Sequence, residues 1–84
     1  MIDPTELPHD QVLDTSGLKC PLPVLKAKKT LKSMTVGSTL KVIATDPGAM
    51  ADFRHFCEVT GDSLLTADEA DGVLTFIIRK ANAS

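Results

Sequence analysis

The residue best suited to chemistry in this chain is Cys20, which lies in the stretch LDTSGLKCPLP, residues 13–23. A thiolate is a strong nucleophile, and how much of it forms depends on the pKa and exposure of the thiol. Pro21 and Pro23 follow Cys20 closely, and their rings fix φ near about −65°. We predict that Cys20 lies at or just before the N-cap of a helix, with Pro21 at the first helical position, where a missing N–H costs little. The two prolines then make a stiff helix start beneath an exposed thiol.

The expected surroundings of Cys20 favour a reactive thiol. The N–H groups and the dipole at a helix start stabilise a nearby anion, and Lys19 adds a positive charge. We therefore expect the pKa of Cys20 to lie below the reference value of about 8.5. The alternative is a small buried hydrophobic residue, as free cysteines often are. For Cys57 burial is the prediction, because it shares a helical face with Met50 and Phe53.

Length and composition predict one small domain. The chain has 84 residues, of which 43% are hydrophobic, and this is enough for a single core. We assign residues 1–10 to a short N-terminal tail, 11–80 to the domain and 81–84 to a C-terminal tail. The acidic N-terminus does not resemble an export signal, and no apolar run approaches the roughly 20 residues of a membrane span. We expect a cytoplasmic protein with reduced cysteines and no membrane contact.

No metal or cofactor site is expected. The potential ligands His9, Cys20, His55 and Cys57 do not have the spacing of a zinc site. Nothing in the sequence pairs His55 with Cys20, and His55 is interpreted as a surface residue.

Hydrophobic periodicity and turn residues predict six elements in the order β-α-β-α-β-β. Strands are expected at 11–15, 39–45, 63–70 and 73–80, a helix at 21–34, and a second helix that ends at Gly61. Asp46 is expected to cap this second helix, with Pro47 at its first position. Asp71-Gly72 is typical of a two-residue hairpin turn. The first crossover should join parallel strands, so the pattern favours one mixed sheet covered by two helices.

Charge is distributed unevenly. Residues 15–45 contain six lysines and no acidic residue, whereas residues 46–71 contain seven acidic residues and one arginine. Such runs are commonly solvated faces. Because the basic segment surrounds Cys20, it is also a candidate docking surface, with Lys19 and Lys26 nearest the thiol.

The stretch around Cys20 resembles the TusA-like sulfur-carrier family. It reproduces the family pattern D-x-x-G-L-x-C-P-x-P with Asp14, Gly17, Leu18, Cys20, Pro21 and Pro23. The similarity continues beyond this stretch and covers about residues 11–80. Its further parts are Asp46-Pro47, the helix with Asp52-Phe53 and Phe56-Cys57, Glu69 with Asp71-Gly72, and the closing Ile78-Arg79-Lys80. It implies an α/β two-layer sandwich, in which a four-stranded mixed sheet carries both helices on one face.

The resemblance also implies a function and a set of roles. Cys20 would accept persulfide sulfur from a cysteine desulfurase or a rhodanese-like donor and pass it to a cysteine of a downstream acceptor protein. Relatives serve tRNA thiolation, sulfur oxidation, molybdenum-cofactor biosynthesis or redox regulation. The other motif residues would shape the site, and three residues are candidates for partner docking. The site-shaping residues are Gly17, Leu18, Pro21 and Pro23, and the docking residues are Lys19, Leu22 and Lys26.

Two other function classes fit a small α/β domain of this kind. A basic helix suits an RNA-binding module, but three phenylalanines without tyrosine or tryptophan leave little for base stacking, and the net charge is −2. Direct nucleic-acid binding is therefore disfavoured. A redox-regulatory protein would use Cys20 as a sensor through its sulfenic acid. Detection of a persulfide on the protein distinguishes a sulfur carrier from an RNA-binding or redox-regulatory protein.

Overall fold

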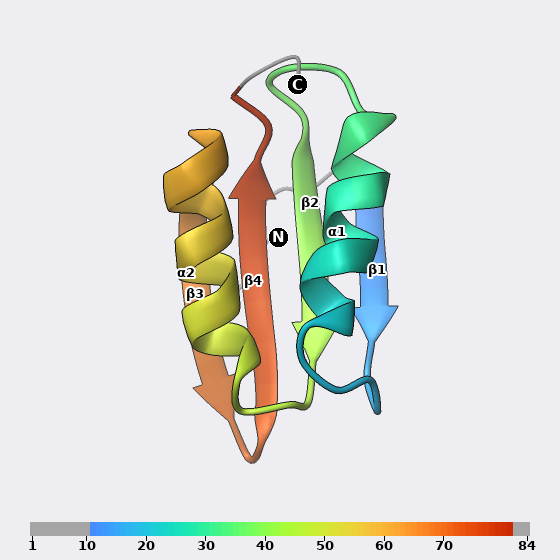
Figure 1. Cartoon of the computed structure of the whole chain (residues 1–84), viewed down its shortest axis with the longest axis vertical. Coiled ribbons are helices and arrows are strands. Elements are labelled where there is room, and N and C mark those ends of the chain that lie inside the picture. The colour runs from blue at the N-terminus through green and yellow to red at the C-terminus, as the bar shows by residue number, and fades with distance from the viewer. Residues whose placement is uncertain (1–10, 82–84) are drawn as a thin grey trace, which may run out of the picture.

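The structure is a computed structural model that describes residues 11–81. Its six elements follow the predicted order (Figure 1). They are β1 (Gln11–Thr15), α1 (Leu22–Lys32), β2 (Thr39–Ala44), α2 (Ala49–Thr60), β3 (Ser63–Ala70) and β4 (Val73–Arg79).

The four strands form one mixed sheet in the order β1-β2-β4-β3. β1 and β2 are parallel, whereas β4 is antiparallel to both β2 and β3. Both helices lie on the same face of the sheet, α1 over the β1–β2 side and α2 over the β4–β3 side (Figure 1). The predicted fold class, a two-layer sandwich with a four-stranded mixed sheet, is confirmed.

The core lies between the helices and the sheet. The inward side chains of the two central strands alternate with period two, as a half-buried sheet requires. They are Leu40, Val42 and Ala44 of β2, with Leu74, Phe76 and Ile78 of β4. Phe53 of α2 is fully buried and stacks on Phe76, with the ring centroids 4.5 Å apart. Burial of one such ring is worth about 1.5–3 kcal/mol, so this pair fixes α2 on the sheet.

Both helices begin later than predicted. Pro21 is the N-cap of α1 rather than its first residue, so Cys20 lies just before the cap. α2 begins at Ala49 with Gly48 as its N-cap, and neither helix has a side-chain cap. Asp46 therefore does not cap α2, and Pro47 precedes the helix. The expected positions were wrong by one or two residues because each proline also suits the loop that leads into a helix.

The ends of the other elements agree closely with the sequence. The bounds of β1 and β3 are as predicted. α2 ends at Thr60, and the predicted stop Gly61 is its C-cap, with a φ of 82° in the left-handed conformation of a glycine cap. Asp71 and Gly72 have φ values of 52° and 80°, which matches the hairpin turn expected there.

Lys80 has an unexpected role. It was predicted as the last residue of a strand, but β4 ends at Arg79, and the Lys80 side chain is buried at 4% exposure. Its Nζ donates hydrogen bonds to the carbonyl oxygens of Leu31 and Met34, each at 2.7 Å. An ammonium group at a helix C-terminus satisfies carbonyls that lack helical partners. Lys80 therefore holds the end of α1 against the sheet.

The predicted tails lie almost entirely outside the described residues, as does His9. Within residues 11–81, no helix has the length and apolar character needed to cross a membrane.

Candidate functional site

The candidate site lies where two loops leave the same edge of the sheet. Because β1 and β2 are parallel neighbours, their carboxyl ends point in the same direction, and the chain after each strand emerges at one place. The buried hydroxyl of Thr15, at the end of β1, donates a hydrogen bond of 2.6 Å to the carbonyl oxygen of Ile43 in β2. The loop that carries Cys20 therefore starts from a fixed point.

Two further hydrogen bonds hold the loop between β1 and α1. The Ser16 N–H donates to Asp14 Oδ1 at 2.9 Å. Hydrogen bonding from the Ser16 side chain and, to a smaller extent, from this N–H lowers the pKa of Asp14. The Gly17 N–H donates to Thr45 Oγ1, also at 2.9 Å. Gly17 has φ of 82°, so this is a turn that requires positive φ rather than a flexible connection. The loop is thus tied to the chain segment that follows β2.

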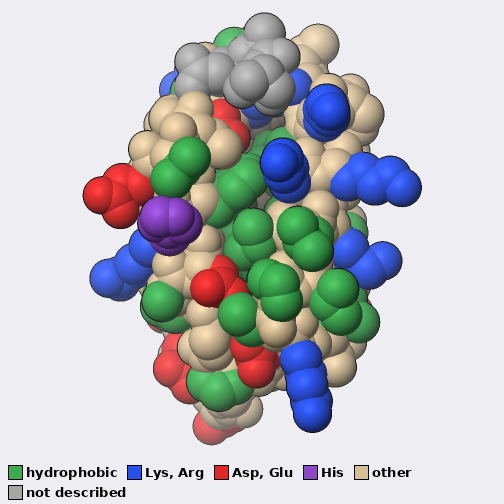
Figure 2. Space-filling model, viewed as in Figure 1, with side chains coloured by type: hydrophobic (Ala, Val, Ile, Leu, Met, Phe, Trp, Pro, Cys, Tyr) green, Lys and Arg blue, Asp and Glu red, His purple; other side chains and the backbone are tan. Residues whose placement is uncertain are grey.

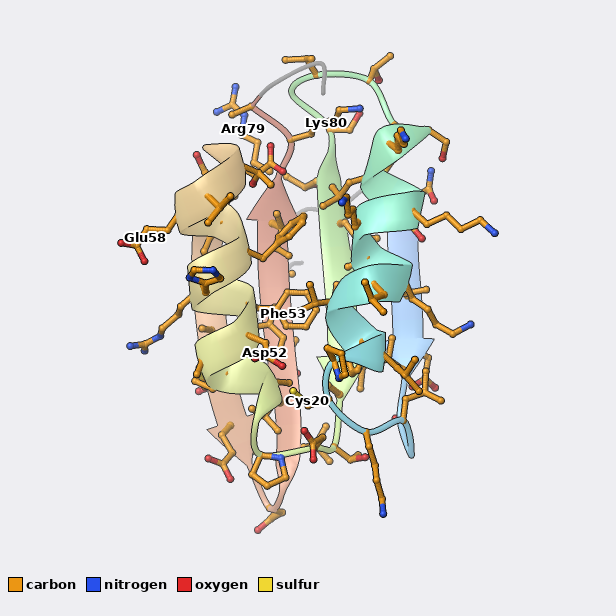
Figure 3. The ribbon with its side chains drawn as sticks, in the orientation of Figure 1. Cys20, Asp52, Phe53, Glu58, Arg79 and Lys80 are labelled. Atoms are coloured by element: carbon orange, nitrogen blue, oxygen red, sulfur yellow. The ribbon has the colours of Figure 1, made fainter. Side chains whose placement is uncertain are left out.

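Cys20 is exposed and lies between two carboxylates from the second half of the chain. Its backbone N–H donates to Asp46 Oδ2 at 3.1 Å. Its thiol donates a hydrogen bond to Oδ2 of Asp52, in the first turn of α2. Figure 3 shows Cys20 below the start of α1, with the Asp52 side chain directed towards it from α2. The site therefore joins the loop before α1 to the start of α2.

The two carboxylates shift the pKa of Cys20 in the direction opposite to the one expected from the sequence. The hydrogen bond to Asp52 and, to a smaller extent, desolvation and the negative charges of Asp52 and Asp46 raise the pKa of Cys20 to about 11. The expectation of a lowered pKa was wrong. Lys19 is not among the groups that shift it. In this arrangement the Cys20 thiol holds its proton at neutral pH.

The start of α1 offers few donors to an anion, which explains why its predicted effect is absent. Pro21 and Pro23 have no backbone N–H, and the Leu22 N–H already donates to the carbonyl oxygen of Lys19 at 2.9 Å. The Leu25 N–H is used within the helix, bonded to Pro21 at 3.1 Å. The prolines that stiffen this helix start also remove the N–H groups that would stabilise a thiolate.

Gly48 leaves space beside the thiol. A Cβ added at this position would lie 3.0 Å from Asp46 Oδ2, 3.4 Å from Cys20 Cβ and 3.6 Å from Cys20 Sγ. Its φ of −69° is open to any residue, so glycine is needed here for room and not for conformation. Any larger side chain at 48 presses on Asp46 and the sulfur.

A groove of about 510 Å³ runs between the two helices and reaches the site. It is lined by Pro21, Val24, Lys28, Ala51, Asp52, His55, Phe56, Val59 and Thr60. Figure 2 shows hydrophobic side chains gathered between the helices and lysine side chains along the α1 side. The groove combines an apolar floor with charged groups at its sides, and one of these, Asp52, also bonds the Cys20 thiol.

The other predicted site residues lie around Cys20 in different environments. Lys19, Pro21, Leu22 and Lys26 are exposed, Leu18 is half-buried and Pro23 is buried. Leu22 and Leu25 are 46% and 53% exposed, which makes an apolar surface on the first turn of α1. Leu25 was not singled out from the sequence.

Cys57 is buried, as predicted. Burial, with a smaller contribution from the charge of Asp62, raises its pKa to about 11. His55 is exposed on α2, also as predicted.

Three residues of the site were missed in the sequence: Asp46, Gly48 and Asp52. They lie 26 to 32 positions beyond Cys20, where local patterns do not connect them. A signal did exist, because Asp46-Pro47-Gly48 follows the strand predicted to pair in parallel with residues 11–15. Loops after parallel neighbours meet at one edge of a sheet.

The chain is similar to known proteins over most of its length. Residues 11–80 match the protein family described as sulfurtransferase TusA. The sulfur carrier protein TusA of Allochromatium vinosum is 53% identical over 72 residues, which span 86% of this chain and 95% of that protein. The TusA of Pseudomonas entomophila is 43% identical over 76 residues, 90% of this chain and 95% of the relative. The crystal structure of a SirA-like protein from Desulfitobacterium hafniense superposes with a TM-score of 0.75 at 25% identity, covering 87% of this chain and all of that one.

Proposed function

Because this chain belongs to the sulfurtransferase TusA family, we propose that it is a sulfur carrier in which Cys20 holds the sulfur as a persulfide. The observation that supports this assignment is the contrast between its two thiols. Cys20 is exposed at the sheet edge, with Gly48 leaving space beside Sγ, whereas Cys57 is buried. A carrier needs one thiol that a partner's cysteine can reach, and Cys20 meets that requirement.

The transfer is an exchange between sulfur atoms, and its balance is simple. The Cys20 Sγ, after losing its proton, attacks the outer sulfur of a donor persulfide. A new S–S bond forms on Cys20, the donor's S–S bond breaks, and its electron pair stays on the donor thiolate, which takes up a proton. In delivery, an acceptor thiolate attacks the outer sulfur on Cys20, and Sγ leaves as the thiolate. The outer sulfur keeps its oxidation state throughout, so no external oxidant or reductant is consumed.

The chain acts as a sulfurtransferase within a relay. Its donor is a cysteine desulfurase or a rhodanese-like protein, and its acceptor is a protein cysteine, as in tRNA thiolation. The reducing cytoplasm suits this role, since the exchange requires a free thiol, and both cysteines are free in the structure. A redox sensor would form a sulfenic acid on the same exposed thiol, so a persulfide rather than a sulfenic acid on Cys20 separates the two functions.

The docking surface surrounds Cys20. Lys19, Leu22 and Lys26 are exposed close to the thiol in the sequence, and Leu25 extends the apolar part of the surface. The motif residues Gly17, Leu18, Pro21 and Pro23 shape the loop and helix start that present it. The lysines attract an acidic region of the partner, and salt weakens that attraction.

Persulfide formation is the direct test of this function. The wild-type protein is mixed with a cysteine desulfurase and cysteine, and its intact mass is measured. We expect a gain of one sulfur atom that dithiothreitol removes and that passes to an added acceptor. A chain that gains no sulfur from desulfurase or rhodanese-type donors is not a carrier of this kind.

Charge reversal tests the docking surface. We expect Lys19→Glu combined with Lys26→Glu to slow desulfurase-dependent loading several-fold at low salt, while circular dichroism stays unchanged. Lys32→Glu, at the far end of α1, is the matched control and should have a smaller effect. Loading that responds neither to salt nor to the double variant would leave the exposed Leu22 and Leu25 as the docking contacts.

A further inference from the structure

The Asp52–Cys20 contact raises a problem for a carrier. Sulfur exchange requires the thiolate of Cys20, yet the protonated thiol donates a hydrogen bond to Asp52 Oδ2. Asp46 Oδ2 accepts a second hydrogen bond, from the backbone N–H of Cys20. Two carboxylates beside one sulfur disfavour its anion. The free protein therefore keeps its reactive group in the unreactive form.

The remaining charges around the thiol do not remove this restraint. Lys19 is exposed and does not shift the pKa of Cys20. Within residues 11–81, the polar partner of the Asp52 carboxylate is the Cys20 thiol itself. Lys28 and His55 line the same groove: Lys28 is about two helical turns along α1 from Pro21, and His55 is three residues after Asp52 on α2. Within residues 11–81 neither forms an ion pair with the Asp52 carboxylate, which leaves it open to a positive charge from another molecule.

We propose that the proteins exchanging sulfur with Cys20 bring a lysine or arginine side chain to Asp52, and that this ion pair releases the Cys20 thiol for attack. The inference rests on the proposed sulfur-carrier function and specifies the chemistry of the partner. In such an ion pair the cation replaces the thiol as the hydrogen-bond partner of the Asp52 carboxylate. It also offsets the negative charge of Asp52, which disfavours the Cys20 thiolate. Asp52 is partly exposed beside the groove, so an incoming side chain can reach it.

The same cation suits the chemistry of the partner. A cysteine that donates or accepts sulfur reacts as a thiolate, and a nearby lysine or arginine lowers its pKa. One positive charge placed between the two sulfur atoms therefore stabilises the thiolate of Cys20 and the thiolate of the partner cysteine. In the absence of a partner, the protonated thiol of Cys20 resists alkylation and oxidation, whose rates follow thiolate content.

Small disulfides of different charge test the release without any partner protein. Cystamine carries two ammonium groups, and 2-hydroxyethyl disulfide is neutral, while both react with a thiol by exchange. Rates are measured at pH 7 and low salt for the wild type, Asp52→Asn and the control Glu58→Gln. Glu58 is on the same helix and is exposed, and Figure 3 shows it directed away from Cys20.

Two results are expected together. Asp52→Asn should react with the neutral disulfide about tenfold faster than the wild type, because the thiol loses its carboxylate acceptor. The preference for cystamine, taken as the ratio of the two rates, should be at least about fivefold greater in the wild type and in Glu58→Gln than in Asp52→Asn. An unchanged neutral rate, or an unchanged ratio in Asp52→Asn, overturns the proposal.

A charge reversal extends the test to a protein partner. Asp52→Lys should speed alkylation by the neutral reagent iodoacetamide but slow sulfur loading from a cysteine desulfurase, since two cations then meet. Glu58→Lys should change neither rate by more than about twofold. If loading rises together with alkylation, the desulfurase brings no cation to Asp52 and the proposal is wrong. A wild-type protein that gains no sulfur at all contradicts the carrier function instead, and the disulfide comparison still decides whether a cation releases the thiol.

Discussion

The surroundings of Cys20 and Cys57 differ, although the pKa of both thiols is raised to about 11. For Cys57 the main cause is burial in the core beneath α2, which is a property of packing. For Cys20 the main cause is a hydrogen bond to Asp52 at the open edge of the sheet. Burial can be reversed only by unfolding, whereas a hydrogen bond at the surface can be exchanged for another partner. The two thiols therefore have similar pKa values for different reasons: Cys57 is inert because it is buried, whereas Cys20 is held protonated by a bond that a partner can replace.

The largest expected difference between the two thiols is their rate of alkylation in the folded protein. Because their pKa values are similar, their thiolate fractions are similar, and access decides the rate. We expect iodoacetamide to modify Cys20 about a hundredfold faster than Cys57 or more, since reaching Cys57 requires an opening that costs several kcal/mol. Peptide mapping after timed quenching measures both rates. In 8 M urea the two rates should converge. Similar rates in the folded state would contradict the difference in access between Cys20 and Cys57.

The raised pKa of Cys57 also predicts a loss of stability at alkaline pH. The unfolded thiol has a pKa of about 8.5, and the folded one about 11. The folded state therefore keeps a proton that the unfolded state releases. The stability contributed by the protonated thiol is full below about pH 8.5 and is lost as pH rises towards about 11.

Urea unfolding of the wild type and Cys57→Ala between pH 7 and 10.5 measures this loss. The alanine variant should be less stable at pH 7 by about 1–3 kcal/mol, because it leaves a small cavity. The difference in free energy of unfolding between the two proteins should narrow above pH 8.5. Cys20 is present in both proteins, so its titration does not affect this difference. A constant gap across this range would show that burial does not hold the proton on Cys57.

The smallest expected effect concerns the space next to Cys20. Gly48→Ala places a methyl group 3.0 Å from Asp46 Oδ2 and 3.6 Å from Cys20 Sγ. Asp46 can move because the contact is with the end of its side chain, so unfolding stability should change by less than about 1 kcal/mol. Persulfide loading should fall severalfold, since the sulfur loses room. Glu58→Ala, at an exposed position of α2 directed away from Cys20, is the control. Equal loading by Gly48→Ala and the wild type would mean that Gly48 does not shape the site.

The sequence predicted the fold well because its signals are local. Periodicity located every strand and helix, and Asp71-Gly72 and Gly61 marked a turn and a helix end that the structure confirms. The main errors lie at the two helix starts, where a proline fits both the loop and the first turn; α1 also ends at Lys32, two residues before the predicted end. Lys80 was missed as a helix cap because its partners in α1 are almost 50 residues away.

The site was predicted only in part, for a related reason. The motif around Cys20 identified the thiol and its loop, but the pKa depends on Asp46 and Asp52, which reach the thiol through the parallel pairing of β1 and β2. The motif contains the start of the helix that follows Cys20, whereas Asp52 belongs to the helix that faces it. A pKa is set by all groups close in space, so a sequence motif locates a thiol more reliably than it gives its acidity.

The most direct measurement for the central claim is the location of the carried sulfur. Cys20→Ser and Cys57→Ser are each mixed with a cysteine desulfurase and cysteine, and their intact masses are compared with that of the wild type. We predict that Cys57→Ser gains one sulfur atom, as the wild type does, and that Cys20→Ser gains none, because only Cys20 is exposed. Loading of Cys20→Ser, or equal loss of loading in both variants, would contradict a single exposed carrier thiol.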